Sequence, residues 1–194
     1  MEQIKKVLIH SIFSISLLFS TALTPHCPVE LGGPPASELE YVNRTPARPV
    51  LAALESFPVS WEDRGNLRAV KAHRSHLASA IESAGKTAHE RRLLLAVGWS
   101  ESTWSVNVCK GIKKGDGGKA WGCWQSWDPA VRGQSMKTQA EIAIKHLKQC
   151  ENYCRGRNAD PVIGAVSLYA TGHSCNWAGA RKRKATYDRM REFL

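Results

Sequence analysis

From residue 63 to the end of the chain, apolar side chains recur with the period of amphipathic helices. Thr87-x-x-Glu90 and Thr138-x-x-Glu141 have the form of helix-capping boxes, and Pro161 stands at the favoured first position of a further helix. Strand patterns are nearly absent, so we predict a mainly α fold. The helices are expected at residues 63–83, 87–104, 138–154, 160–169 and 178–193.

One charge interrupts the apolar stripe of the helix predicted at residues 87–104. Leu94, Val97, Glu101 and Trp104 fall on one face of that helix. Burial of an ionised carboxylate is costly unless a partner or a raised pKa relieves it. Because Trp99, Trp104 and the leucines supply an apolar surround, we expect the pKa of Glu101 to be raised. The lysines of the following GIKKGDGGK segment oppose that shift, but they are expected to stay in water, where salt screens them.

The N-terminal segment has the composition of an export signal. Lys5-Lys6 precede an apolar run over residues 7–23, and Ser20-Thr21-Ala22 has the small residues of a signal-peptidase site. An uncleaved membrane anchor is the alternative, but the run is shorter than the roughly 20 apolar residues that span a bilayer. We therefore predict a signal peptide over residues 1–22 and export to the periplasm or the extracellular space.

The rest of the chain divides into a linker and one domain. Residues 23–58 are rich in proline and are expected to form an extended linker, while residues 59–194 can build one globular core. The formal net charge of +10 attracts polyanions, and export argues against intracellular nucleic acid. An anionic wall or membrane surface is therefore the expected partner. We interpret the cluster Arg181-Lys182-Arg183-Lys184 as the solvated face of the last helix.

Six cysteines follow the predicted signal peptide, and an even number in an exported chain indicates disulfides. Cys150 and Cys154 stand four residues apart on a predicted helix, where Cβ atoms are about 6 Å apart, so each is expected to pair elsewhere. A bridge between Cys109 and Cys123 would confine the glycine-rich loop between them. A metal site is the competing interpretation, but no paired-cysteine zinc spacing is present, so no metal or cofactor is predicted. The cysteines are Cys27, Cys109, Cys123, Cys150, Cys154 and Cys175, and the metal site would use His146, Cys150, Cys154, His173 and Cys175.

Four short segments stand in order along the second half of the chain. They are ESTW at 101–104, GCWQS at 122–126, AVSLYATG at 165–172 and Thr186-Tyr187. In this order they resemble the Glu-Ser-x-aromatic, Gly-Leu-Met-Gln-Ile, Ala-x-Tyr-Asn-x-Gly and Glu-Thr-x-x-Tyr segments of the lytic transglycosylase family. Trp124 replaces the family's methionine and Ala170 its asparagine, and the segment between Glu101 and Gln125 is long and closed by cysteines.

The resemblance implies a lysozyme-like helical domain with a glycine-rich, cysteine-closed loop after the catalytic helix. The family cuts the MurNAc-GlcNAc β-1,4 bond of peptidoglycan glycan strands and leaves 1,6-anhydro-muramyl ends. Glu101 would first protonate the leaving oxygen and then act as base, a task for which an apolar surround suits a glutamate. From the residues alone, Trp121, Trp124 and Trp127 lie in and around the segment at 122–126, where flat rings could stack on sugars, although core packing is the default expectation for any one of them. The residues expected to contact the substrate are Ser102, Trp124, Gln125, Tyr169 and Tyr187.

Two alternatives stay open at this point. A muramidase that uses water would need a second carboxylate, for which Asp116 and Asp128 are candidates, although both have the sequence surroundings of turn residues. A non-catalytic wall-binding module would need only the basic surface. The biological role is also open among wall turnover, lysis of a neighbour and work with secretion-system or envelope-assembly partners.

Overall fold

The structure is a computed structural model that describes residues 48–194, apart from the side chains of Arg48 and Asp116. The predicted signal peptide (1–22), the linker as far as residue 47, and Cys27 lie outside the described residues. Within the described part, no helix is long and apolar enough to cross a membrane.

The described chain is mainly helical, as predicted. It contains no β-strand and only isolated bridges, such as the one between Gly115 and Ala120. Short 3-10 turns cover Trp61–Asp63, Asp116–Gly118, Pro129–Val131 and Met190–Glu192. The helices are α1 (Arg48–Glu55), α2 (Leu67–Ala84), α3 (Ala88–Ser102), α4 (Val106–Cys109), α5 (Met136–Cys154), α6 (Pro161–Thr171) and α7 (Ala180–Arg189).

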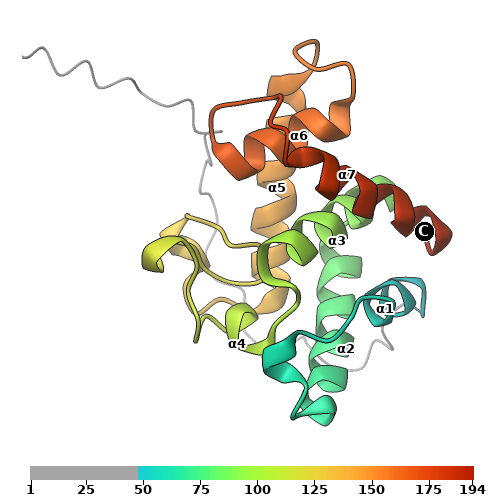
Figure 1. Cartoon of the computed structure of the whole chain (residues 1–194), viewed down its shortest axis with the longest axis vertical. Coiled ribbons are helices and arrows are strands. Elements are labelled where there is room, and N and C mark those ends of the chain that lie inside the picture. The colour runs from blue at the N-terminus through green and yellow to red at the C-terminus, as the bar shows by residue number, and fades with distance from the viewer. Residues whose placement is uncertain (1–47) are drawn as a thin grey trace, which may run out of the picture.

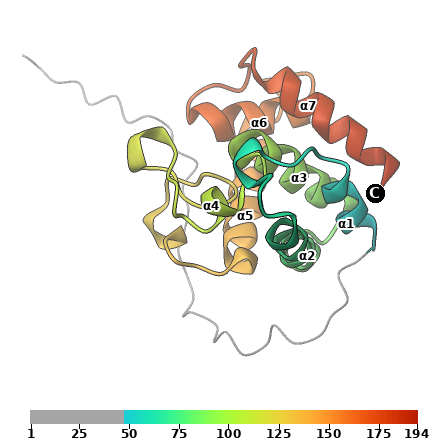
Figure 2. The same cartoon turned by 60° about the horizontal axis from the view of Figure 1, so that its bottom comes forward.

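Helix α3 is the central element of the domain. It packs against α2, α5, α6 and α7, and both views show it between them (Figures 1 and 2). All six residues from Leu93 to Gly98 are buried, because neighbours cover α3 on several sides in this stretch. The segment between α4 and α5 lies to one side of the helices, next to the C-terminal end of α3 (Figure 1). Residues at that end are therefore placed between the helical core and this segment.

Helix α1 belongs to the core, which corrects the predicted linker. Val50, Ala53 and Leu54 are buried, and the Phe57 ring stacks on Trp99 with 4.7 Å between the ring centroids. These apolar positions have helical spacing, but prolines on both sides hid the pattern in the sequence. The linker expected over 23–58 thus extends too far, since residues 48–58 contain α1 and a buried aromatic anchor. The core begins before residue 59.

Local capping signals fix several helix starts. The Thr87 hydroxyl accepts the N–H of Glu90 at 3.2 Å, and the Glu90 carboxylate accepts the N–H of Thr87 at 3.3 Å, so this predicted capping box is confirmed. The Asp160 carboxylate caps α6, which begins at Pro161 as predicted. In contrast, α5 begins two residues before Thr138. Its cap is Ser135, whose hydroxyl accepts the N–H of Thr138 at 3.2 Å.

Two disulfides hold the domain together, one between Cys109 and Cys123 and one between Cys154 and Cys175. The first closes the glycine- and lysine-rich loop as the sequence suggested. The second confirms that Cys154 pairs elsewhere than with Cys150, which is buried in α5. It also takes two of the thiols that the competing metal-site interpretation required. Two disulfides are consistent with an exported protein.

His73 on α2 is buried beside the Cys109–Cys123 disulfide. Only 4% of its surface is exposed, and neither ring nitrogen has a hydrogen-bond partner among the described residues. Burial lowers the pKa of His73 from 6.5 to about 4; Asp63 opposes this shift, and Lys110, His76 and Arg74 add to it. The folded protein therefore keeps this imidazole neutral near pH 7.

We expect His73 to weaken the fold as the pH falls from about 6.5 to 4. In this window the unfolded chain binds a proton that the folded chain excludes, so the free energy of unfolding should drop by up to about 3 kcal/mol. His73→Leu should lose this part of the pH dependence, whereas His76→Leu, at an exposed position of α2, should keep most of it, because burial of His73 is the main cause of the shift. Urea unfolding at several pH values tests this. Parallel stability curves for the wild type and His73→Leu would show that burial of His73 has no such effect.

Candidate active site

Glu101 lies on the last turn of α3, and 20% of its side chain is exposed. The guanidinium of Arg183, from α7, donates a hydrogen bond to its carboxylate. Arg183 also lies above the ring of Trp177, with 4.9 Å from its guanidinium carbon to the ring centroid. A half-exposed tryptophan, a buried arginine and the glutamate therefore form one connected group.

The position of Arg183 differs from the sequence interpretation, which placed it on a solvated basic face. Arg183 is 8% exposed and lies with Ala180 and Tyr187 on the buried face of α7. Lys182, its neighbour, is exposed. The run of four basic residues obscured this spacing, although the stripe of positions 180, 183 and 187 carried the signal.

The ion pair also changes the electrostatic expectation for Glu101. The sequence predicts that desolvation raises the pKa of Glu101 and outweighs the opposing loop lysines. The guanidinium of Arg183 is a further opposing influence, because an adjacent opposite charge favours the ionised carboxylate. A loop lysine was the expected source of opposing charge, but the partner comes from α7.

Tyr169, on α6, connects Glu101 to the segment that follows the bridged loop, which is the loop of residues 110–122 closed by the Cys109–Cys123 disulfide. Its hydroxyl donates a hydrogen bond to the main-chain oxygen of Trp124 at 2.9 Å. Burial and the charge of Glu101 raise the pKa of Tyr169 well above 10, while Arg183 opposes the shift. Tyr169 is therefore a neutral hydrogen-bond donor that lies close enough to Glu101 to sense its charge.

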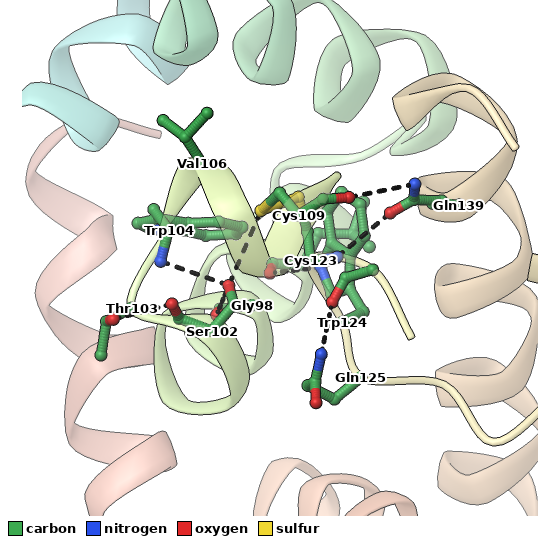
Figure 3. The surroundings of a disulfide bond; sticks show 12 residues. Gly98, Ser102, Thr103, Trp104, Val106, Cys109, Cys123, Trp124, Gln125 and Gln139 are labelled. Carbon is green, nitrogen blue, oxygen red and sulfur yellow. Dashed lines mark hydrogen bonds between the residues drawn. A yellow bond between two sulfur atoms is a disulfide. The ribbon is translucent and has the colours of Figure 1, made fainter. Parts of the chain in front are cut away.

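A left-handed turn ends α3 immediately after Glu101. Thr103 and Trp104 have φ of 49° and 57°, a region that bulky residues rarely adopt. The Ser102 hydroxyl holds the turn: it donates to the Gly98 oxygen at 2.9 Å and accepts the Trp104 N–H at 3.2 Å (Figure 3). Backbone strain of this kind is often found at functional sites.

Three of the predicted substrate contacts are buried: Ser102, Trp124 and Tyr187. Ser102 is 4% exposed and holds the turn, so its side chain is not presented to solvent. Trp124 is 1% exposed, and its indole N–H donates to the Leu94 oxygen at 2.9 Å. The prediction that the Trp124 ring stacks on a sugar is therefore wrong, because the ring belongs to the core and packs edge-on against Trp104. Its main chain still matters, as the acceptor for Tyr169.

Gln125 is half-buried and has a φ of 47°. Its side-chain amide donates to the Gly122 oxygen at 2.8 Å (Figure 3). Its Oε1 lies over Gly115, where a Cβ atom would approach to 1.8 Å, so any larger residue at that position would displace the Gln125 side chain. Gln139 of α5 secures the same segment by accepting the Cys123 N–H at 3.1 Å.

Tyr187, the remaining predicted substrate contact, lies away from Glu101. Its hydroxyl contacts Nδ1 of His89 at 2.7 Å. His89 precedes Glu101 by twelve residues of α3, which is about 18 Å along the helix axis. Of the predicted site residues, the structure connects Tyr169 to Glu101, and it adds Arg183 and Trp177. Gln125 adjoins this group only through its neighbour Trp124, whose main-chain oxygen accepts the Tyr169 hydroxyl.

The other predicted candidates have separate roles. Asp128 caps the turn at Pro129–Val131 by accepting the Ala130 N–H at 2.9 Å, which agrees with its interpretation as a turn residue. The side chain of Asp116 lies outside the described part. Of the neighbouring tryptophans, Trp127 is 56% exposed, whereas the Trp121 ring is flanked by two cationic side chains. A pocket of about 270 Å³ between the bridged loop and the start of α5 includes Trp121 but not Glu101.

No family model, curated protein or solved structure matches this chain significantly. The functional assignment therefore rests on the arrangement of its own residues.

We expect Gly98→Ala to disturb the turn that follows Glu101. A Cβ atom at Gly98 would approach the Trp104 ring to 2.0 Å, and overpacking of this kind costs about 1–3 kcal/mol. Gly65→Ala is the matched control, because nothing lies within 4 Å of its Cβ position. Thermal melts and near-ultraviolet circular dichroism of the two variants measure the effect. If Gly98→Ala were as stable as Gly65→Ala, the Trp104 ring would not need the absence of a side chain at Gly98 in order to pack against α3.

Proposed function

We propose that this protein is an exported lytic transglycosylase that cuts the MurNAc-GlcNAc β-1,4 bond of peptidoglycan. The observation that carries the proposal is the position of Glu101: a partly exposed carboxylate at the end of a buried helix, grouped with Tyr169, Arg183 and the segment of Gln125. In support, Tyr169 connects three of the four segments that resemble the family, because its hydroxyl donates to the main-chain oxygen of Trp124, and burial and the charge of Glu101 raise the pKa of Tyr169. The basic charge suits an anionic wall polymer, and the two disulfides suit export.

The chemistry requires one group that acts first as acid and then as base. Protonated Glu101 would donate its proton to the glycosidic oxygen, which leaves with the GlcNAc side of the cut. The resulting carboxylate would accept a proton from the muramyl 6-hydroxyl while that oxygen attacks C1. The products are a new hydroxyl end and a 1,6-anhydro ring, with no water consumed, and Glu101 is again protonated.

Arg183 places a condition on the first step. Its guanidinium favours ionised Glu101, whereas the acid step needs the protonated form. Arg183 therefore has to move away from Glu101, or lose part of its influence, when the substrate is bound. The guanidinium already lies over the Trp177 ring while it pairs with Glu101, so this contact would remain available when the ion pair loosens. In the second step the same guanidinium would stabilise the carboxylate that has given up its proton.

We expect Glu101→Gln to lower peptidoglycan cleavage by a factor on the order of 100 or more, because the amide keeps the shape but has no transferable proton. Glu141→Gln, at an exposed position of α5, is the matched control and should leave cleavage unchanged. Mass spectrometry of purified peptidoglycan digested by each variant measures both rate and product. Undiminished cleavage by Glu101→Gln would refute the assignment.

The same digest separates the alternatives. Anhydro-muramyl ends identify a transglycosylase, and hydrated reducing ends identify a muramidase. A loss of cleavage in Asp128→Asn as large as that in Glu101→Gln would also favour the muramidase. Binding to intact wall without any cleavage by the wild-type protein would favour a non-catalytic module.

We expect Arg183→Gln to move the alkaline limb of the pH–activity profile to higher pH. Above the alkaline limb the essential acid is ionised, and loss of the guanidinium lets Glu101 stay protonated at higher pH. Lys182→Gln, at the adjacent exposed position of α7, removes the same formal charge and should shift the limb little. The measurement is kcat/KM from pH 4 to 9 for the three proteins. Coincident limbs would mean that Arg183 does not control the ionisation of Glu101.

A further inference from the structure

Three side chains from distant parts of the chain converge behind the bridged loop: His73 from α2, Cys109 at the end of α4, and Cys123. One ring nitrogen of His73 and the two sulfur atoms all lie within 4.8 Å of one another. Figure 3 shows the disulfide end of this cluster, which adjoins Ser102 and Gln139. Within residues 48–194, this is the one group of at least three histidine, cysteine or carboxylate residues with such geometry.

The state of His73 indicates that the cluster is more than close packing. The residue is 4% exposed, yet neither ring nitrogen has a hydrogen-bond partner among the described residues. Buried polar atoms nearly always have a partner, and a lost one costs about 1–3 kcal/mol. A neutral, unpartnered imidazole facing two sulfur atoms has the donor type of a metal ligand. Disulfide sulfurs are weak ligands, but thiolates bind thiophilic cations strongly.

We propose that opening the Cys109–Cys123 disulfide creates a metal site, in which the two thiolates and one ring nitrogen of His73 bind a single thiophilic divalent cation of the Zn²⁺ class. A set of two cysteines and one histidine with an open fourth position is a known zinc-ligand set. This inference does not depend on the proposed function.

The positions of the three ligand atoms are compatible with a tetrahedral site once the disulfide is open. With Zn–S of about 2.3 Å and Zn–N of about 2.0 Å, tetrahedral ligands lie roughly 3.6–3.8 Å apart. The two sulfur atoms, now bonded to each other, would separate to about 3.8 Å, while the His73 nitrogen, which lies within 4.8 Å of both, would approach by about 1 Å or less. The cation would keep the ends of the bridged loop joined and would also attach them to α2.

The redox step is balanced when a phosphine is the reductant. The phosphine and one water molecule convert the disulfide into two thiols, and the phosphine becomes its oxide. Cation binding then releases the thiol protons, since the ligands are thiolates. A phosphine brings no thiol of its own that would compete for the metal.

The test uses the full-length protein, reduced under anaerobic conditions and titrated with Co²⁺, whose thiolate complexes absorb in the near ultraviolet. We expect one Co²⁺ per reduced chain, displaceable by Zn²⁺, and no such absorption in the oxidised protein. Cys154→Ser/Cys175→Ser should bind equally well, because that bridge lies outside the cluster. Cys109→Ser/Cys123→Ser should lose the absorption, and His73→Leu should weaken binding by roughly tenfold or more.

A second readout on the wild-type protein identifies the ligands without mutation. After reduction, Zn²⁺ should protect Cys109 and Cys123 from alkylation, as mapped by mass spectrometry, and leave Cys154 and Cys175 reactive. Protection of other cysteines instead, or equal binding by Cys109→Ser/Cys123→Ser, would overturn the proposal. Failure of the reduced wild type to bind one Co²⁺, whatever the cause, would overturn it as well.

Discussion

The ion pair between Glu101 and Arg183 joins α3 to α7 at the candidate active site, and both the packing of α7 and the charge of Glu101 depend on it. Each residue occupies a position in the otherwise apolar face of its helix, one on α3 and one on α7, so neither charge is well solvated. Loss of one partner from such a buried pair costs about 3–5 kcal/mol, whereas replacement of both is often neutral. The pair therefore couples the docking of α7 to the presence of Glu101, while adding little that an apolar contact would not provide.

The surrounding structure fixes the direction of Glu101. Ser102 and Gly98 form the turn that brings Trp104 back against α3, and Trp104 packs against Trp124. The main chain of Trp124 accepts the hydroxyl of Tyr169, which lies near Glu101. The buried rings of Trp104 and Trp124 thus do not reach Glu101 themselves; they position the main chain that holds Tyr169. Many side chains at the candidate site are buried; those that remain at least partly exposed include Glu101, Gln125, Tyr169 and Trp177.

Sequence signals within one helical turn predict the starts of α3 and α6 correctly, whereas features that depend on contacts between distant segments are not predictable from the sequence. The capping box at Thr87 and the proline start of α6 involve residues within one helical turn, so the sequence contains the whole interaction. Helix α1 was missed because its stability comes from the burial of residues such as Leu54 against distant helices. The burial of Arg183 differs: the spacing of positions 180, 183 and 187 contains the signal, but the neighbouring basic residues favour a solvated face, and the packing of α7 on α3 confirms which residue is buried.

A double-mutant cycle tests whether Glu101 and Arg183 are paired for catalysis or for stability. The free energy of unfolding and the peptidoglycan-cleaving activity are measured for the wild type, Glu101→Gln, Arg183→Gln and the double variant. If the pair is kept for chemistry, the double variant should recover most of the stability that Arg183→Gln loses, yet remain inactive. A double variant as unstable as the sum of the single changes, or one that still cleaves peptidoglycan, would contradict the account.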